Sequence, residues 1–196
     1  MLMTMTNQDI QKKLIILTAP SGAGKTTIAH ELLKQMPELS FSVSATTRAP
    51  RRGEVEGTDY YFLSPDEFRQ RIAARDFLEY EMVYEGKYYG TLYSELERIW
   101  RQNKFPLRVV DVAGALALKE KFGGKALSIF IQPPSLASLK SRLDSRGTED
   151  PQALKERLEK AGLEIQFATR FDHTVVNDSL DHAVQLASQL IRQFLY

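Results

Sequence analysis

Short apolar runs alternate along the chain with stretches of helical spacing. Residues 107–112 and 126–131 are two such runs, rich in β-branched side chains, and each precedes a helical stretch. Repetition of this order predicts βαβ units and therefore a parallel sheet with helices packed on it. The expected strands are residues 15–18, 41–46, 107–112, 126–131 and 173–176.

Two stretches have the spacing of helices with one apolar side. Residues 25–36 place Ile28, Leu32 and Met36 on one side, and Pro37 ends the pattern. Residues 180–194 are expected to form the last helix. The side chains that should face inward from it are Ala183, Val184, Ala187, Leu190, Ile191 and Phe194.

Residues 47–93 interrupt the alternation and are expected to form a small α+β insertion. Ser64 and Glu67 have the spacing of a capping box, and Pro65 suits the first position of a helix. The expected elements are a basic loop (47–57), a strand (59–62), a helix (65–74) and two paired strands (77–84 and 88–93).

Residues 135–160 interrupt the alternation of strands and helices a second time, and are expected to form an arginine-rich pair of helices. One helix is expected to end at Gly147, and the next to open at Asp150-Pro151. An insertion and a helical flap beside one sheet suggest two parts that close over a site.

The segment between the first strand and the first helix has the clearest chemical signal. It follows the P-loop pattern, except that Ala19 stands at the first glycine. Gly22 and Gly24 let the backbone turn its amides toward an anion, and the following helix adds its positive end. Lys25 is expected to reach the β- and γ-phosphates, and the Thr26 hydroxyl to hold Mg²⁺. The expected nucleotide-binding residues are Ala19, Pro20, Ser21, Gly22, Ala23, Gly24, Lys25, Thr26 and Thr27.

The bulk composition narrows the class of protein only a little. The chain has 196 residues and a net charge of +1, so no overall field favours a nucleic acid or a membrane surface. It has no cysteine, which excludes disulfides, thiolate catalysis and cysteine zinc sites and agrees with a cytoplasmic location. Residues 1–11 show no periodicity and are expected to be a loose leader. Composition and charge do not decide the oligomeric state, so a homo-oligomer remains one of the expected possibilities.

A second loop concentrates positive charge. Arg48, Arg51 and Arg52 lie close together near the end of an expected strand, where ligands of α/β sheets bind. Arg48 and Arg51 are spaced to fork onto one phosphate, because a guanidinium matches phosphate geometry bidentately. A solvated basic loop is the competing interpretation.

Taken together with the P-loop, the segment from Phe41 to Glu54 resembles guanylate kinase. It reads F-S-V-S-A-T-T-R-A-P-R-R-G-E and leads to Gly57-Thr58-Asp59-Tyr60. The likeness covers residues 13–195 in order. The further matching segments are 77–80, 88–91, 142–143, 145–149 and 175–178.

The resemblance implies a fold and a reaction. The reaction is transfer of the γ-phosphate of ATP to GMP, giving ADP and GDP, with Mg²⁺ as cofactor. The expected partners are these small-molecule substrates, with no nucleic acid and no membrane. The implied fold is an α/β, three-layer P-loop core with a parallel sheet (12–46, 94–134 and 161–196), an inserted α+β domain for the nucleoside monophosphate (47–93) and a helical lid (135–160).

The resemblance also implies roles in the acceptor site. The residues it assigns to the phosphate of GMP are Arg48, Arg51, Tyr60 and Tyr89. Those it assigns to the guanine base are Ser44, Glu79, Thr91 and Asp111. The chemistry agrees, because one ionised carboxylate can accept from both N1–H and the N2 amine of guanine. Adenine presents a lone pair at N1, and leaving a buried group unpaired there costs on the order of 1–3 kcal/mol, or more for a charge.

The neighbours of Asp111 differ from those usual in the family. An acidic residue often lies two positions earlier and a glutamine two positions later, where this chain has Val109 and Ala113. Asp111 then stands alone at the strand end, where it can serve Mg²⁺ through water, guanine, or both. Tyr61 and Tyr88 point to the opposite strand face from their neighbours Tyr60 and Tyr89. They are expected to be ordinary packing residues of the strands.

The helical pair supplies Arg142, Arg146 and Arg157. By resemblance they belong to the lid and, with Lys25 and Arg48, stabilise the charge of the transferred phosphoryl group. The alternative is that these arginines only form ion pairs with nearby carboxylates on the surface of the helices. The resemblance places Asn177 at the adenine of ATP, while a turn that caps the last helix is the alternative, and the two can coexist. No general base is required, so the histidines are interpreted as structural or exposed.

Two other functions compete with this interpretation. Guanylate-kinase-like domains also occur as protein-binding modules that have lost catalysis, but such modules usually lack the P-loop lysine and the arginines present here. A different P-loop kinase would not need Glu79 together with Ser44 and Thr91. A GTPase is excluded, because the sequence has no Asn-Lys-x-Asp motif for the base.

Overall fold

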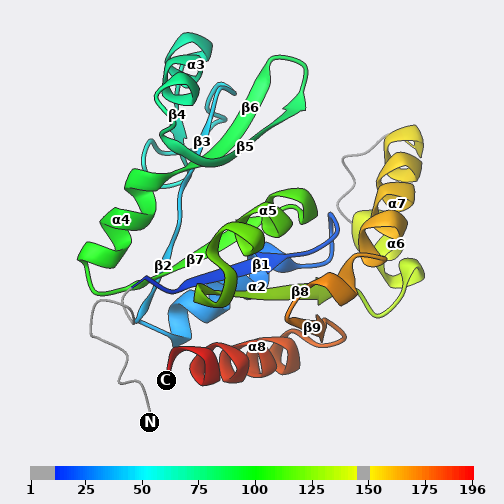
Figure 1. Ribbon diagram of the computed structural model, residues 1–196. Coiled ribbons are helices and arrows are strands. Elements are labelled where there is room, and N and C mark those ends of the chain that lie inside the picture. The colour runs from blue at the N-terminus through cyan, green and yellow to red at the C-terminus, as the bar shows by residue number, and fades with distance from the viewer. Residues whose placement is uncertain (1–11, 145–150) are drawn as a thin grey trace.

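A parallel sheet of five strands forms the centre of the molecule. The computed structural model describes residues 12–144 and 151–196. Its strands follow the order β2-β7-β1-β8-β9, all parallel, which confirms the predicted α/β class (Figure 1). The strands are β1 (Leu14–Thr18), β2 (Leu39–Phe41), β7 (Phe105–Val110), β8 (Ala126–Gln132) and β9 (His173–Val176).

Helices cover both faces of this sheet. Side chains Ile15 and Leu17 of β1 pack with α2 and α8, whereas Leu14 and Ile16 pack on the opposite face with α4 and α5. A strand buried on both faces needs a continuous apolar run, which is why β1 does not alternate. The helices are α2 (Lys25–Gln35), α3 (Pro65–Ala73), α4 (Tyr93–Arg101), α5 (Val112–Phe122), α6 (Leu136–Asp144), α7 (Pro151–Ile165) and α8 (Leu180–Leu195), with short 3-10 turns at Gly123–Lys125 and Ala168–Arg170.

A smaller sheet lies beyond one edge of the first (Figure 1). Its strands follow the order β4-β3-β6-β5, and the predicted pairing of β5 with β6 is confirmed. Helix α3 begins with the expected capping box of Ser64 and Glu67. Its Phe68 is fully buried and stacks on Phe77. The strands are β3 (Ser44–Thr46), β4 (Tyr60–Phe62), β5 (Phe77–Tyr84) and β6 (Lys87–Leu92).

The segment 41–46 forms two strands, and the expectation of one continuous strand is wrong. Strand β2 ends at Phe41 in the large sheet, and β3 begins at Ser44 in the small one. Between them the amide of Val43 donates to the buried carboxylate of Glu95 (2.9 Å). This hydrogen bond replaces a ladder partner at the point where the chain leaves one sheet for the other.

Other boundaries move by a few residues. The strand expected at 107–112 ends at Val110, because the Asp111 side chain caps helix α5. The strand expected at 88–93 ends before Tyr93, which begins α4, a helix that the sequence pattern did not predict. Since β3 belongs to the small sheet, the expected core segment 12–46 contributes a strand to each sheet.

Helices α6 and α7 pack against each other on the opposite side of the large sheet from the small one (Figure 1). Leu139, Leu143 and Ala161 form their small buried cluster. The predicted helix end at Gly147 lies outside the described residues, as does the leader at 1–11.

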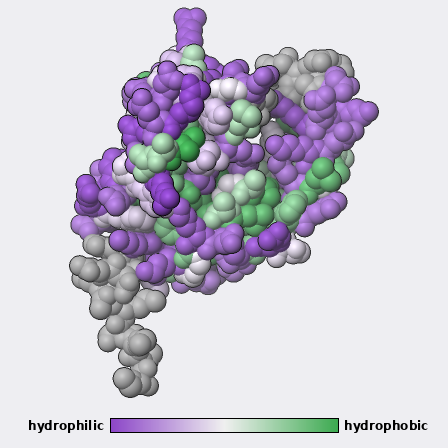
Figure 2. Space-filling model, turned by 45° about the horizontal axis from the view of Figure 1, so that its top comes forward, coloured by the Kyte–Doolittle hydropathy of each residue, from purple (hydrophilic) through white to green (hydrophobic). Residues whose placement is uncertain are grey.

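Most of the apolar side chains are buried in these clusters, and the surface is correspondingly polar. The face shown in Figure 2 is mostly hydrophilic, with apolar surface gathered near its middle. Among the described helices, none combines the length and apolarity that crossing a membrane requires.

Candidate active site

The P-loop turns at its glycines. Gly22 and Gly24 have positive φ angles of 87° and 95°, a region in which a side chain is strained. Space is also short, because a Cβ at Gly24 would lie 2.4 Å from Nδ2 of Asn177. Ala19 is buried and its φ is not positive, so its methyl group is accommodated where the motif usually has glycine.

Asn177 links the P-loop to the end of β9. Its side-chain amide is buried and donates to the carbonyl of Ala23 (2.8 Å). Arg142 of α6 donates in turn to the Asn177 carbonyl (2.8 Å). The cap of α8 is Ser179, which accepts from the amide of His182, rather than Asn177 itself. Contact of Asn177 with adenine stays a prediction.

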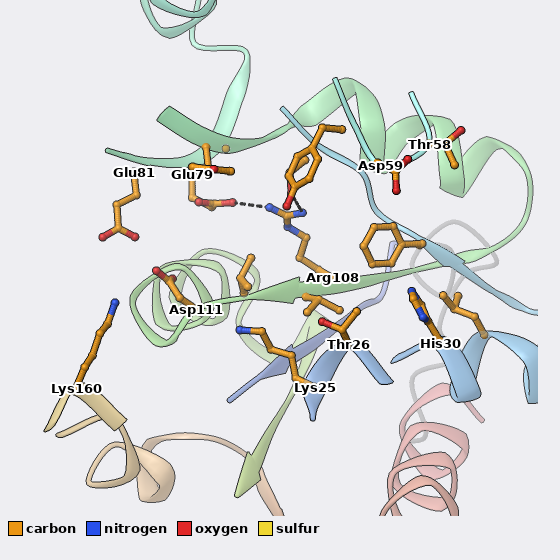
Figure 3. A pocket seen from close by; sticks show the side chains of 18 residues that line it. Lys25, Thr26, His30, Thr58, Asp59, Glu79, Glu81, Arg108, Asp111 and Lys160 are labelled. Carbon is orange, nitrogen blue, oxygen red and sulfur yellow. Dashed lines mark hydrogen bonds and ion pairs between the residues drawn. The ribbon is translucent and has the colours of Figure 1, made fainter. Parts of the chain in front are cut away.

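A cavity of about 720 Å³ extends from the P-loop to the small sheet. In Figure 3, Lys25 and Thr26 lie at one side of it and Glu79 at the other. It therefore joins the expected donor and acceptor halves. The predicted site residues that line it are Lys25, Thr26, Ser44, Tyr60, Glu79, Tyr89 and Asp111.

Lys25 supplies positive charge at the P-loop end. Its side chain points into the cavity toward Asp111 (Figure 3), and its ammonium lies 3.5 Å from the Ala19 carbonyl. Burial lowers the pKa of Lys25, while the Asp111 carboxylate opposes that shift. An anionic ligand would stabilise the charged form, as phosphate binding requires.

Glu79 is held at the acceptor end by a hydroxyl and a guanidinium. The register of β5 and β6 pairs it with Thr91, whose hydroxyl donates to Oε1 of Glu79. Thr91 is fully buried behind Glu79 and does not line the cavity. The nearby Asp111 uses one carboxylate oxygen to accept from the amide of Gly114 (2.8 Å).

Arg108 is a site residue that the sequence interpretation missed. It lies in the middle of β7, is 3% exposed and lines the cavity. It donates to Ser44 Oγ (2.6 Å) and to Glu79 Oε1 (3.3 Å). Its position as one arginine inside an apolar strand was the available signal, because such a charge is rarely buried without a partner.

The arginine loop is fixed by a carboxylate of its own. Arg48 donates to both oxygens of Glu54, each at 2.8 Å, and Glu54 also accepts from the amide of Arg51 (2.6 Å). The hydrogen bond between the side chains raises the pKa of Arg48 and lowers the pKa of Glu54 to about 2. Both groups are therefore charged at neutral pH.

The same arginine lies against the tyrosines of the acceptor site. Its guanidinium carbon is 5.1 Å from the centre of the Tyr60 ring, and the Tyr60 and Tyr89 rings meet edge to face. Arg48 and Arg51 themselves do not line the cavity. Their sharing of one phosphate stays a prediction. Tyr61 and Tyr88 pack in the apolar cluster of the small sheet, as expected.

Further ionisable side chains line the cavity without having been predicted. Glu81 follows Glu79 by two residues in β5, and this spacing in a strand was the signal for a shared side. The neighbouring Asp111 carboxyl, together with burial, raises the pKa of Glu81 to about 7. Lys160 reaches the cavity from α7 (Figure 3), and His30 lies exposed at its edge.

The lid arginines lie partly within the described residues. Arg142 and Arg157 are half-buried on α6 and α7, and Arg142 contacts the end of β9 as described above. Arg146 lies outside the described residues. The structure therefore leaves their action on ATP a prediction.

The oxygen atoms at the P-loop end fit Mg²⁺ carried by a nucleotide. Thr26 and Asp111 both line the cavity and offer the hard oxygen ligands that Mg²⁺ prefers. Within residues 12–144 and 151–196, no three His, Cys, Asp or Glu side chains gather into a self-contained metal site. This suits Mg²⁺, which keeps several waters and binds through few protein oxygens together with substrate phosphates.

Comparison with known proteins agrees with this geometry. The family model described as guanylate kinase matches residues 11–194. The guanylate kinase of Salinibacter ruber is 54% identical over 94% of this chain and 97% of its own length. That of Porphyromonas gingivalis is 51% identical over 93% of this chain and 98% of its own length.

Solved structures give the same result. The crystal structure of guanylate kinase from Anaplasma phagocytophilum aligns with a TM-score of 0.72 and 31% identity, covering 92% of this chain and 85% of that one. A shikimate kinase from Bacteroides thetaiotaomicron aligns with a TM-score of 0.50 and 16% identity over 93% of this chain and 98% of its own, which supports the fold alone. The chain belongs to the guanylate kinase family and is a kinase.

Proposed function

We propose that the protein transfers the γ-phosphate of ATP to GMP, giving ADP and GDP, in purine nucleotide metabolism. One observation carries the proposal: a P-loop and a carboxylate suited to guanine face each other across a single cavity, with Lys25 at one end and Glu79 at the other. Membership of the guanylate kinase family supports the same pair of substrates.

The donor half binds ATP through the P-loop. The amides around Gly22 and Gly24 and the start of α2 surround the phosphates, and Lys25 contacts the β- and γ-phosphates. Mg²⁺ held here would supply positive charge that offsets the negative charge of these phosphates. Thr26 would hold the metal, and Asp111 would contact it through water, contact guanine, or do both.

The acceptor half selects GMP by its base and its phosphate. Glu79 accepts from N1–H and the N2 amine of guanine, with Ser44 and Thr91 beside it. Arg48, Arg51, Tyr60 and Tyr89 bind the phosphate. Arg48 suits this task because Glu54 already fixes its side chain, so less freedom is lost on binding.

The lid arginines complete the site when the helical pair closes. Arg142, Arg146 and Arg157 stabilise negative charge on the oxygens of the transferred group, which is what a loose phosphoryl-transfer transition state requires. We retain the division into a P-loop core, an acceptor insertion at 47–93 and a lid at 135–160 as part of this proposal. The lack of cysteine agrees with action in the cytoplasm.

Acceptor preference in an ADP-release assay tests the function. The purified protein with MgATP should release ADP fastest with GMP, and much more slowly with AMP, UMP or dTMP. Lys25→Met is the control, because it removes the phosphate contact while keeping a side chain of similar length, and should abolish release with every acceptor. Faster release with any acceptor other than GMP would contradict the proposal.

A further inference from the structure

Arg108 and Glu79 form a buried ion pair in the wall of the cavity. They are adjacent in Figure 3, where a dashed line joins them, although they come from strands of different sheets. The side chains are 4% and 13% exposed. Removing two charges from water is costly, and an apolar pair of the same size is often at least as stable. Fold stability alone therefore does not account for an arginine in β7.

The contacts of Arg108 leave donor capacity unused. Its guanidinium donates to the Ser42 carbonyl (3.2 Å), to Ser44 Oγ and to Glu79. A guanidinium has five N–H donors, and Nε of Arg108 is buried without a partner. Nη1 uses both of its N–H groups and Nε is enclosed by the protein, so the donor left for a ligand is the second N–H of Nη2, beside the one given to Glu79.

The contacts of Glu79 leave one of its oxygens unused. The Thr91 hydroxyl and Arg108 both donate to Oε1. No hydrogen bond of the described residues ends on Oε2. The pair thus combines a guanidinium with a spare N–H group and a carboxylate with spare acceptor capacity, side by side in one wall.

We propose that Arg108 is a specificity-determining residue that donates to O6 of guanine while Glu79 accepts from N1–H and the N2 amine. This inference rests on GMP being the acceptor. Along that edge guanine presents an acceptor, a donor and a donor, and the ion pair presents a donor, an acceptor and an acceptor. Arginine is a common donor to guanine O6 in other recognition settings.

The arrangement rejects adenine at two positions. The exocyclic amine of adenine is an N–H donor at the position of O6, so it would face the N–H groups of Arg108. Its N1 lone pair would face Glu79. Each mismatch leaves a buried polar group unpaired, worth about tenfold or more in kcat/KM. Arg108 therefore adds to the selectivity of Glu79 instead of only holding it in place.

Changing one atom of the substrate tests this contact. The measured quantities are kcat/KM for GMP, for 6-thio-GMP, whose sulfur is a poor acceptor at the O6 position, and for IMP, which keeps O6 but lacks the N2 amine. The wild-type protein should prefer GMP over 6-thio-GMP by about tenfold or more. Arg108→Met should reduce that ratio at least fivefold while leaving the ratio of GMP to IMP nearly unchanged, because Glu79 still contacts the N2 amine.

A merely structural role predicts a different result. If Arg108 only supports the fold, all three substrates lose rate in proportion and both ratios stay at their wild-type values, which would overturn the inference.

Arg108→Lys keeps the positive charge and is the second variant, for use if Arg108→Met does not fold. A lysine ammonium lacks the two-pronged shape of a guanidinium and cannot donate to Glu79 and to O6 together. The ratio of kcat/KM for GMP to that for 6-thio-GMP should therefore fall in this variant also, and an unchanged ratio would overturn the inference. Failure of the wild-type protein to prefer GMP among nucleoside monophosphates would instead refute the proposed function.

Discussion

Two arginines at the acceptor end are each paired with a carboxylate: Arg48 with Glu54, and Arg108 with Glu79. The pairs differ in their setting. Arg48 lies in a loop over the Tyr60 ring, and its pairing with Glu54 is local in sequence. Arg108 lies in a central strand and meets Glu79 from another sheet. The sequence could reveal the first pair by its spacing, whereas the second depends on how the two sheets are placed.

Glu54→Gln should weaken GMP binding although Glu54 does not line the cavity. The side-chain amide of glutamine cannot accept from both Nη1 and Nη2 of Arg48 as a carboxylate does, so Arg48 loses its fixed orientation. We expect the KM for GMP to rise about three- to tenfold, with the KM for ATP unchanged. Glu97→Gln, in an exposed pair on α4, is the matched control. Equal KM values for GMP in the two variants would argue against this role.

Glu81 should make folding stability depend on pH. Its pKa of about 7 lies above its ordinary value of 4.5, so the native protein holds a proton that the unfolded chain releases at lower pH. Stability should therefore fall as the pH rises from about 4.5 to about 7, where the ionised Glu81 meets Asp111. Thermal denaturation at pH 5 and pH 8 should show a smaller loss of Tm for Glu81→Gln than for the wild-type protein. The same loss in both proteins would contradict the assignment.

At the scale of elements, the P-loop depends on contacts from distant parts of the chain. Asn177 at the end of β9 bonds to it, and Leu143 of α6 lies so close that a Cβ at Gly22 would be 2.7 Å from its side chain. Both glycines are favoured by their positive φ angles, and a Cβ at either position would also displace a neighbouring side chain. The motif could be recognised from sequence and the resemblance assigned Asn177 to the ATP site. The contacts of Asn177 and Leu143 with the loop could not be recognised, because both residues lie more than a hundred positions later in the chain.

Asn177→Ala should impair ATP binding. Loss of the hydrogen bond to Ala23 leaves a buried carbonyl unpaired and loosens the loop, so we expect the KM for ATP to rise about tenfold with little change in the KM for GMP. Ser179→Ala, which removes the cap of α8 nearby, is the control for general damage to this region. If the two variants have the same KM for ATP, Asn177 has no specific role in the loop.

Phe68→Ala should disrupt the small sheet more than the large one. Phe68 is fully buried between α3 and the strands, and truncation of such a side chain costs about 3–5 kcal/mol. GMP binding should weaken strongly while ATP binding, measured by calorimetry, persists. Phe167→Ala, at a site that is 38% exposed, should change neither. Equal loss of both nucleotides in Phe68→Ala would show that the two sheets unfold together.

For the molecule as a whole, the alternation of apolar runs and helical stretches was enough to predict the parallel sheet. The prediction of a single strand was wrong between Phe41 and Ser44, where the chain passes from one sheet to the other. Periodicity shows which side chains are buried, but it does not show which sheet buries them. For the same reason the sequence predicted Glu79 and Ser44 but not Arg108, which joins them only after the two sheets are placed.

The proposed reaction depends above all on selection of guanine by Glu79. The most direct test is the ratio of kcat/KM for GMP to that for AMP, measured with MgATP for the wild-type protein and for Glu79→Gln. We predict a wild-type preference for GMP of a thousandfold or more, since at least two buried polar groups lose their partners with AMP, and a fall of about a hundredfold in the variant. A ratio that is the same in both proteins, or a wild-type preference for AMP, would contradict the account.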